Sequence, residues 1–469
     1  MTTGADRATG FGDNAEALYR RVTLRIVPYI FVCYLFNYLD RVNVGFAKLQ
    51  MLDALGLNDE QFGLAAGIFF IGYVCCGVPA NIALQKFGAR RWLSIIMVVW
   101  GALSASLAFV HSATAFYVLR FLTGAAEAGF FPGLVLYLTR WFPTDRRGRV
   151  MALFMAAIPL SGVVGGPLSG WIMASFGGGA AGAPGGVGGL QAWQWLFLLQ
   201  GAPTVALGVG VAFILSDDAK RARWLSSMDR AALEGRLSAD AAAQAPAQRA
   251  ANFGDVLRSP WIWAMGLVYF CVQGGVYAIN FWLPSLVRAS FGEDLQLVGW
   301  LSAAPYAVAA AVMLLVGRSA DRTQERRWHL AGPMLLAAAG LLTAAWTGGA
   351  HAQDPTIRFV ALLGMSLGAS GALTGLAMFW PLASSFLGAE AAAAGLALIN
   401  SMGQVAGFVS PYLVGWISHV TGGPGDALVV LAALMVAGVA IVLRSPVAGR
   451  TGRAACAIFV GRKAGNETR

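Results

Sequence analysis

Four ionisable side chains interrupt long apolar stretches of this sequence, and their types allow charge and proton chemistry. Asp40 and Arg41 are neighbours in the first stretch. Arg120 and Glu127 lie in the fourth. A charge at the centre of a membrane-spanning helix costs about 2.5 to 3.5 kcal/mol, so such side chains normally face a protein interior or a water-filled cavity. We therefore expect a functional site shared by these two stretches. Static ion pairs that hold the helices together are the alternative.

Helical spacing places further hydrogen-bond donors beside one of the arginines. Polar residues three or four positions apart form a stripe along one face of the first stretch, made of Tyr34, Asn37, Tyr38 and Arg41. The planar fork of arginine binds a carboxylate through two parallel hydrogen bonds and stays charged at any accessible pH. Arg120 and Glu127 are nearly two helical turns apart and share one face. The pattern predicts a pocket for an organic anion.

Charge balance links this anion to protons. Two arginines and two ionised carboxylates form a neutral group, so an entering anion leaves an uncompensated negative charge in apolar surroundings. Protonating one carboxylate per anionic charge removes this cost, because burial favours the protonated acid while a nearby arginine opposes it. We therefore expect anion and proton to bind together. Protonating both Asp40 and Glu127 with a monoanion would instead carry positive charge inward, and the sequence leaves both stoichiometries open.

The elements that position these charges are membrane-spanning helices. The 469 residues are 57% hydrophobic and only 12% charged, a composition typical of a bilayer protein rather than a soluble one. Apolar runs of about 20 residues recur along the chain, each long enough to cross about 30 Å of hydrocarbon. We expect twelve spans, at residues 22–47, 61–84, 92–110, 115–138, 149–175, 193–215, 260–288, 297–317, 329–349, 357–387, 391–418 and 426–444.

The spans form two sets of six joined by one long hydrophilic segment. We predict an all-α membrane protein with an N-terminal half at 1–215, a linker at 216–258 and a C-terminal half at 259–469, the halves being pseudo-symmetric. With cytoplasmic termini, 28 of the 33 Lys and Arg residues fall in cytoplasmic tails and loops. This asymmetry follows the positive-inside rule, so we expect both termini in the cytoplasm and the protein in the inner membrane. The net charge of +10 then reflects topology rather than nucleic-acid binding.

A repeated loop indicates that the two halves arose by duplication. The loop after the second span ends in Arg90-Arg91-Trp92, and the loop after the eighth ends in Arg326-Arg327-Trp328 at the same offset. Two related halves predict a substrate site between them, near the middle of the bilayer. An ordinary basic cytoplasmic loop, repeated by chance, is the alternative.

The second half contributes neutral polar groups rather than buried charges. They are Gln273, Tyr277 and Asn280 in the seventh span, Trp380 in the tenth, and Asn400 and Gln404 in the eleventh. Such groups can orient hydroxyls or an aromatic ring of a substrate. Neutral amides also hold membrane helices together, and the two roles stay equally open at this point.

The repeated loops resemble the cytoplasmic signature of the major facilitator superfamily, Gly-x-x-x-Asp-Arg followed by a basic end. The copy at residues 317–327 is close to it, whereas the first copy has Gln85-Lys86 in place of Asp-Arg. Longer motifs resemble the anion:cation symporter family within that superfamily. They are Asn37-Tyr38-Leu39-Asp40-Arg41-Val42-Asn43, Val78-Pro79-Ala80-Asn81, Trp141-Phe142-Pro143, Phe379-Trp380-Pro381 and Ile399-Asn400-Ser401.

The resemblance implies a major facilitator fold and roles for individual residues. Proton coupling is implied for Asp40 and Glu127, and anion binding for Arg41 and Arg120. Together with the polar faces above, the predicted substrate contacts are Arg41, Arg120, Tyr38, Tyr73, Asn37, Gln273, Tyr277, Trp380 and Asn400. The predicted cytoplasmic gate consists of Gln85, Lys86, Arg90, Arg91, Asp321, Arg322, Arg326 and Arg327.

These observations predict a proton-coupled secondary transporter that imports a small organic anion by alternating access. Tartrate, sugar acids and aromatic acids are the kinds of carboxylate that the resemblance implies. A proton-coupled antiporter or exporter is the alternative, because the Gly- and Pro-rich residues 162–170 resemble an exchanger motif. The sequence has no catalytic, metal-binding or phosphate-binding constellation, so we expect neither an enzyme nor a cofactor or metal. We expect a monomer surrounded by lipid, without a nucleic-acid partner.

Overall fold

The computed structural model describes residues 5–177, 186–244, 258–347, 354–384 and 389–444. Across these residues the secondary structure is helical, without a strand. Eleven of the described helical segments are long and apolar enough to cross a membrane, by length and composition. The twelfth expected span corresponds to α14, which packs against α2 and α10.

Helices of the first set alternate in direction across the bundle. The set comprises α1 (Ala5–Leu55), α2 (Asp59–Phe87), α3 (Ala89–Ser106) with the short η1 (Leu107–Phe109), α4 (Ala113–Glu127), α5 (Phe130–Thr139), α6 (Thr144–Phe176) and, after η2 (Val187–Gly189), α7 (Ala192–Ile214). Each predicted span of this half overlaps one of these helices, or in two cases a consecutive pair: α3 with η1, and α4 with α5.

The second set follows a short connecting helix. After η3 (Ala219–Arg221) and α8 (Ser227–Gln244), the set comprises α10 (Pro260–Phe291), α11 (Leu295–Thr323), α12 (Arg327–Thr347), α13 (Pro355–Ser384), α14 (Ala389–Thr421) and α15 (Gly425–Arg444). The ends predicted at residues 349 and 387 fall outside the described residues, as does the stretch 245–257 of the predicted linker.

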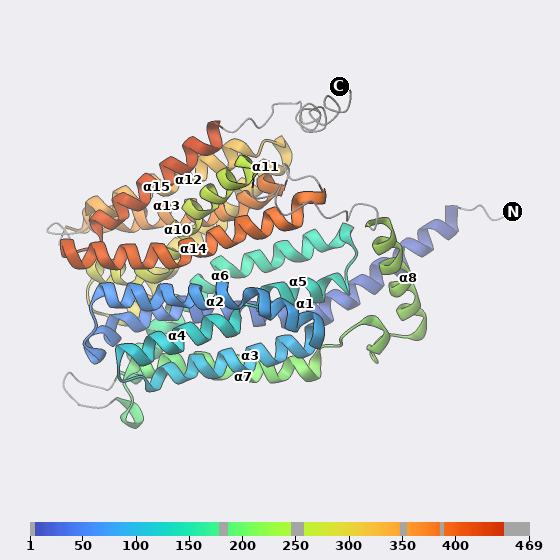
Figure 1. Cartoon of the computed structure of the whole chain (residues 1–469), viewed down its shortest axis with the longest axis horizontal. Coiled ribbons are helices and arrows are strands. Elements are labelled where there is room, and N and C mark those ends of the chain that lie inside the picture. Colours follow the sequence, from blue (N-terminus) through green and yellow to red (C-terminus); the bar gives the residue numbers. More distant parts are fainter. Residues whose placement is uncertain (1–4, 178–185, 245–257, 348–353, 385–388, 445–469) are drawn as a thin grey trace, which may run out of the picture.

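The two sets lie side by side as two layers, blue to green for α1–α7 and yellow to red for α10–α15 (Figure 1). They meet mainly where α2 packs on α14 and α6 packs on α11, with α1 against α10 between these contacts. In each of the first two pairs, the second span of one set contacts the fifth span of the other. This reciprocity is the arrangement expected of two halves related by a pseudo-twofold axis.

Glycines allow the backbones of the two sets to approach closely. A Cβ atom on Gly299 of α11 would lie only 2.6 Å from the carbonyl oxygen of Gly166 on α6. A Cβ atom on Gly63 of α2 would overlap the carbonyl of Pro411 on α14. Small residues serve this purpose in membranes because close packing replaces the hydrophobic driving force that water supplies elsewhere.

The fourth predicted span, 115–138, lies within one membrane-spanning segment, Ala113–Thr139, but this segment consists of two helices. Helix α4 ends at Glu127, and α5 begins at Phe130 after a turn at Ala128 and Gly129. Pro132 lacks the N–H that would bond the carbonyl of Ala128, so the helical ladder is interrupted there. The break places Glu127 at a helix end inside the bundle.

Helix α8 docks on one end of the first set, which we call the linker end. Arg21 of α1 pairs with Asp229 of α8 at 3.1 Å, and Arg236 of α8 pairs with Asp145 of α6 at 3.4 Å. These contacts explain why α1 is helical well before residue 22, where the predicted span begins. The extension is a polar helix that packs against α8 rather than part of an apolar span.

At the opposite end, which we call the far end, polar contacts join the two sets. The Lys48 ammonium lies 2.8 Å from the Asp59 carboxylate and 3.2 Å from the centroid of the Trp282 ring. Arg288 of α10 donates a hydrogen bond to the carbonyl of Leu49 at 2.6 Å. Lys48 and Asp59 both belong to the first set, whereas Trp282 belongs to the second.

We predict that Gly299→Ala destabilises the folded protein. The added methyl group would press on the Gly166 carbonyl, and such overpacking costs about 1 to 3 kcal/mol. The matched control is Gly332→Ala in α12, where a Cβ has nothing within 4 Å. Thermal unfolding of the purified protein should show a lower Tm for the first variant and an unchanged or higher Tm for the control. Equal Tm values would contradict the close packing of α6 and α11.

Candidate functional site

A large cavity of about 1170 Å³ lies between the two sets of helices. Its wall comes from α1, α2, α4, α5 and α6 on one side and from α10, α11, α13 and α14 on the other. It extends from Arg41 and Glu127, in the middle of the bundle, to Gln324 and Arg326, which follow α11 at the linker end. The cavity therefore lies where the repeated loops predict a substrate site.

Arg41 and Glu127 form a buried ion pair on this wall. The Arg41 Nε atom donates to Glu127 Oε1 at 3.1 Å, and its Nη2 atom contacts the same oxygen. The side chains belong to helices far apart in sequence, and the residues are 8% and 2% exposed. In a low-dielectric interior a paired charge is tolerated, whereas either charge alone is costly.

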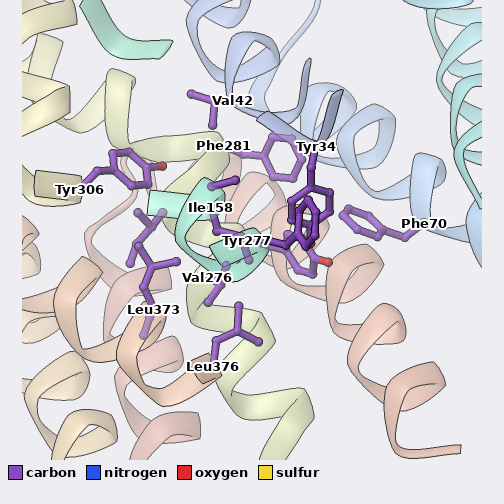
Figure 2. Close-up of a cluster of buried hydrophobic side chains, with 14 of the residues drawn as sticks. Tyr34, Val42, Phe70, Ile158, Val276, Tyr277, Phe281, Tyr306, Leu373 and Leu376 are labelled. Carbon is purple, nitrogen blue, oxygen red and sulfur yellow. The ribbon is translucent and has the colours of Figure 1, made fainter. Parts of the chain in front are cut away.

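Aromatic rings surround the Arg41 guanidinium. The centroids of four rings lie between 5.2 and 6.0 Å from its central carbon; they belong to Tyr38, Phe69, Phe70 and Tyr73. Ring faces attract a cation through their quadrupole and hold the planar guanidinium in a fixed orientation. Tyr277 of the second set packs on Phe70, with 4.4 Å between the ring centroids (Figure 2). Both halves thus contribute to the surroundings of Arg41.

Asp40 does not line the cavity in this structure. Its carboxylate faces α3, where Ser104 donates to Oδ1 at 3.3 Å, and Asn43 donates to the same atom at 3.4 Å. Among the described residues, Oδ2 has no hydrogen-bond partner. Successive helical residues point about 100° apart, so Asp40 and Arg41 leave α1 in different directions. The sequence places them together, but only Arg41 reaches the wall.

Arg120 is also buried away from the cavity wall. Its Nε and Nη2 atoms donate to the carbonyls of Ala65 and Ala66 on α2 at 3.4 and 3.5 Å. Its central carbon lies 4.7 Å from the centroid of the Phe69 ring, which also faces Arg41. Arg120 therefore supports the aromatic surroundings of Arg41 from behind. Of the four predicted charges, the structure brings two to the cavity surface.

The second set lines the cavity with a hydrogen-bonded chain of neutral groups. Gln273 donates to the Tyr277 hydroxyl at 3.3 Å, and that hydroxyl donates to Gln404 at 3.3 Å. Trp380 lies against Tyr269, with ring centroids 4.9 Å apart. Sequence reasoning missed Tyr269, although its spacing of four from Gln273 places it on the same helical face.

The remaining predicted substrate contacts all lie on the cavity wall. Asn37, Tyr38, Tyr73 and Asn400 line the cavity. Asn280, which shares the polar face of the seventh span, instead accepts a hydrogen bond from Tyr306 at 2.9 Å inside the second set. No group of three or more His, Cys, Asp or Glu that could hold a metal ion occurs in the described part of the chain.

The predicted gate residues lie at the linker end but differ in their surroundings. Asp321 and Arg326 line the cavity there, and Arg326 donates to the Pro381 carbonyl at 2.6 Å. Arg90 pairs with Asp217 at 3.2 Å, which ties the first loop to the segment after α7. The other five gate residues, Gln85, Lys86, Arg91, Arg322 and Arg327, do not line the cavity.

Glu325 organises the second loop. Burial acts to raise the pKa of its carboxyl group, but backbone N–H groups of Trp328 and Arg327 and the ring of His329 lower that pKa, and the net pKa lies below the usual value. The ionised carboxylate accepts from the N–H groups of Arg327 and Trp328 at 2.8 and 3.0 Å, at the start of α12. An anion at a helix N-terminus is favourable because it pairs with N–H groups that have no helical partner.

Known proteins match this chain along nearly its whole length. A protein named as metabolite transport protein NicT of Pseudomonas putida is 42% identical over 92% of this chain and 95% of its own. A protein of Agrobacterium vitis named as a tartrate transporter is 43% identical over the same shares. The quinolone resistance transporter of Acinetobacter baumannii is 35% identical over 91% of this chain and 94% of its own.

Solved structures agree on the fold. The xylose transporter XylE from E. coli, in a partially occluded inward-open conformation, superposes with a TM-score of 0.70 at 13% identity and covers 91% of this chain and 98% of its own. An inward-facing bacterial homologue of the human lysosomal transporter Spinster gives 0.67 at 15% identity, with coverage of 93% and 96%. The all-α fold class predicted from the sequence is confirmed.

The family model of the Major Facilitator Superfamily matches residues 30–411, which is most of the chain and runs from α1 of the first set into α14 of the second. This match confirms the resemblance seen in the repeated loops, and it agrees with the transporter names of the relatives. The chain therefore belongs to the Major Facilitator Superfamily and is a multi-pass membrane transporter.

Proposed function

We propose that this transporter imports a small organic anion together with protons by alternating access. The observation that carries the proposal is the Arg41–Glu127 pair on the cavity wall. The Arg41 guanidinium, which is suited to bind a carboxylate, already pairs with the Glu127 carboxylate. A cargo anion and Glu127 therefore compete for one guanidinium.

Protonation of Glu127 decides this competition. With Glu127 ionised, a bound anion would share one guanidinium with a second negative charge in a buried site, which is electrostatically unfavourable. With a proton on Glu127, the carboxyl group is neutral, and Arg41 and the anion form a neutral pair. Cargo and proton then enter the same occluded state, and loss of the proton restores the Arg41–Glu127 pair and expels the anion. This exchange couples the two fluxes.

Asp40 is the proposed second proton-binding group. Its carboxylate is buried beside Arg41 on α1, and the two hydrogen bonds recorded for it come from neutral donors and are long, at 3.3 and 3.4 Å. Neutral donors compensate an ionised carboxylate less well than a cation does. Because it lies off the cavity wall, Asp40 can exchange a proton without competing with the cargo for space.

Orientation follows from the basic loops. We propose that the linker end faces the cytoplasm of the cell and that the protein is a monomer in the inner membrane, because this orientation satisfies the positive-inside rule. The cavity would then face inward. The Agrobacterium vitis relative named for tartrate transport supports a carboxylate cargo.

Export by proton antiport is a second candidate, supported by the relative named as a quinolone resistance transporter. The two functions differ in whether the substrate moves in the same direction as the protons or in the opposite direction. Proteoliposomes with an acidic exterior should accumulate labelled anion if the protein is a symporter and should lose preloaded substrate if it is an antiporter.

We predict that Glu127→Gln abolishes accumulation driven by a proton gradient. The neutral amide mimics the protonated acid, so Arg41 stays available, and exchange of labelled for unlabelled substrate should continue. Both rates are measured in proteoliposomes. The control is Asp426→Asn, an exposed acid at the start of α15, which should accumulate substrate like the wild type. Accumulation at the wild-type level by Glu127→Gln would contradict the coupling role.

The same assay tests Asp40, and we predict that Asp40→Asn lowers proton-driven accumulation at least tenfold. The amide keeps the size of the side chain but removes its proton exchange. Substrate affinity, measured by binding to purified protein, should change less than threefold because Asp40 does not contact the cavity. A large loss of affinity with intact coupling would exclude this role.

The two arginines should respond differently to lysine. Arg41→Lys replaces a fork by a point charge, and we predict that the Kd for substrate rises tenfold or more. Arg120→Lys should change this Kd less than threefold and lower the Tm, because its guanidinium contacts backbone carbonyls and a ring. Binding and thermal unfolding of both purified variants check this. An equal loss of affinity in both would place Arg120 in the binding site.

A further inference from the structure

The charges on the cavity wall restrict the cargo more narrowly than the proposed function does. Among the described residues, four charged side chains line the cavity: Arg41 and Glu127 in the middle, and Asp321 and Arg326 at the linker end. The middle of the cavity therefore offers one cation. Lys48 is committed to Asp59 at the far end, and Arg120 lies behind Phe69. A second carboxylate on the cargo would have no cation to meet there.

Aromatic side chains make up much of the cavity wall. From the first set, Tyr34 packs edge-on against Tyr38 at 5.3 Å and lies 6.2 Å from Phe131. From the second set, Tyr269 and Trp380 pack together at 4.9 Å. All five residues line the cavity. Two groups of flat rings, one from each half, suit a planar aromatic body between them, because rings prefer to pack face to edge or in offset stacks.

Two buried amide groups on the wall lack partners. Asn37 lies one helical turn before Arg41 and is 3% exposed, and its Nδ2 donor has no hydrogen-bond partner among the described residues. Gln273 is 5% exposed, and its amide nitrogen donates to the Tyr277 hydroxyl. Its Oε1 acceptor has no hydrogen-bond partner among the described residues. Buried polar groups without partners are costly, so a ligand that satisfies both gains selectivity over one that cannot.

These two groups have complementary roles. Asn37 is a donor next to the guanidinium of Arg41, and a carboxylate needs donors for both of its oxygens. Gln273 is an acceptor on the opposite set of helices, so it requires a donor on the cargo. A phenolic hydroxyl or a ring N–H supplies one.

We propose that the cargo is a planar aromatic monocarboxylate that carries a hydrogen-bond donor on its ring, in preference to a dianionic hydroxy acid. This inference rests on the proposed function, because it takes Arg41 as the carboxylate-binding group. It separates this chain from the cargo that the name of its Agrobacterium vitis relative suggests. The carboxylate binds Arg41 and Asn37, the ring lies between the two aromatic groups, and the donor reaches Gln273.

A ligand series on the purified full-length protein tests each part. The probes are 4-hydroxybenzoate, benzoate, cyclohexanecarboxylate, terephthalate and tartrate, and binding is measured by calorimetry. We expect 4-hydroxybenzoate to bind at least tenfold tighter than benzoate, and benzoate to bind tighter than cyclohexanecarboxylate, which has a ring but no π-system. Terephthalate and tartrate should bind weakest because each carries a second carboxylate. Tartrate binding tighter than both aromatic acids would overturn the inference.

A variant tests the donor site. Gln273→Met keeps the length of the side chain but removes the acceptor, and the tenfold preference for 4-hydroxybenzoate over benzoate should disappear. The control is Gln296→Met at the exposed start of α11, which should keep the preference. Because the readout is a ratio of two affinities in one protein preparation, partial misfolding does not mimic the effect. A preserved preference in Gln273→Met would exclude Gln273 as the acceptor.

The outcomes also separate this inference from the proposed function. Binding of 4-hydroxybenzoate that does not lead to proton-driven accumulation in proteoliposomes would overturn the coupling mechanism but support the cargo class. Proton-driven accumulation of tartrate, with no binding of the aromatic acids, would support the coupling mechanism and overturn the cargo class.

Discussion

A guanidinium removed from water must be paired, and the centre of this molecule is built around that requirement. Arg41 is held by Glu127 and enclosed by rings from α1 and α2. The break between α4 and α5 places Glu127 at a helix end within reach of α1. In the proposed mechanism, protonation of Glu127 frees Arg41 to bind the cargo anion, and loss of that proton restores the ion pair and releases the anion.

The packing of the halves leaves this pair accessible from one side. Close glycine contacts hold α6 against α11 and α2 against α14, so the cavity is framed by two tight seams rather than by flexible loops. The reciprocal arrangement of second and fifth spans is the one expected where two halves tilt about a shared axis, as in the proposed alternating-access cycle. The chemistry in the middle of the cavity is asymmetric within this symmetric frame: there the first half carries the charged pair, and the second half carries neutral amides and further rings.

The sequence predicted most of the fold because its signals are local. Apolar run length located most spans to within a few residues, but α1 begins well before residue 22 and continues to Leu55, and α11 continues to Thr323. The repeated loops predicted two related halves with a cavity between them. The site was harder to predict. The length of an apolar run does not show which side of the helix faces the cavity, so Asp40 and Arg120 were expected in the pocket with Arg41. The helix break at Gly129 was also missed. Pro132 indicates it, but proline does not interrupt an apolar run, so run length alone gave no break.

The far end contains a contact whose composition bears on how the transporter opens. Lys48 keeps its partner Asp59 within one rigid half, and only the face of the Trp282 ring belongs to the other. Separation of the halves would leave the Lys48–Asp59 ion pair intact and would replace the indole surface over the ammonium group by water, but it would also break the hydrogen bond from Arg288 to the Leu49 carbonyl. Opening at this end would therefore expose charged groups to water without separating Lys48 from its counter-ion.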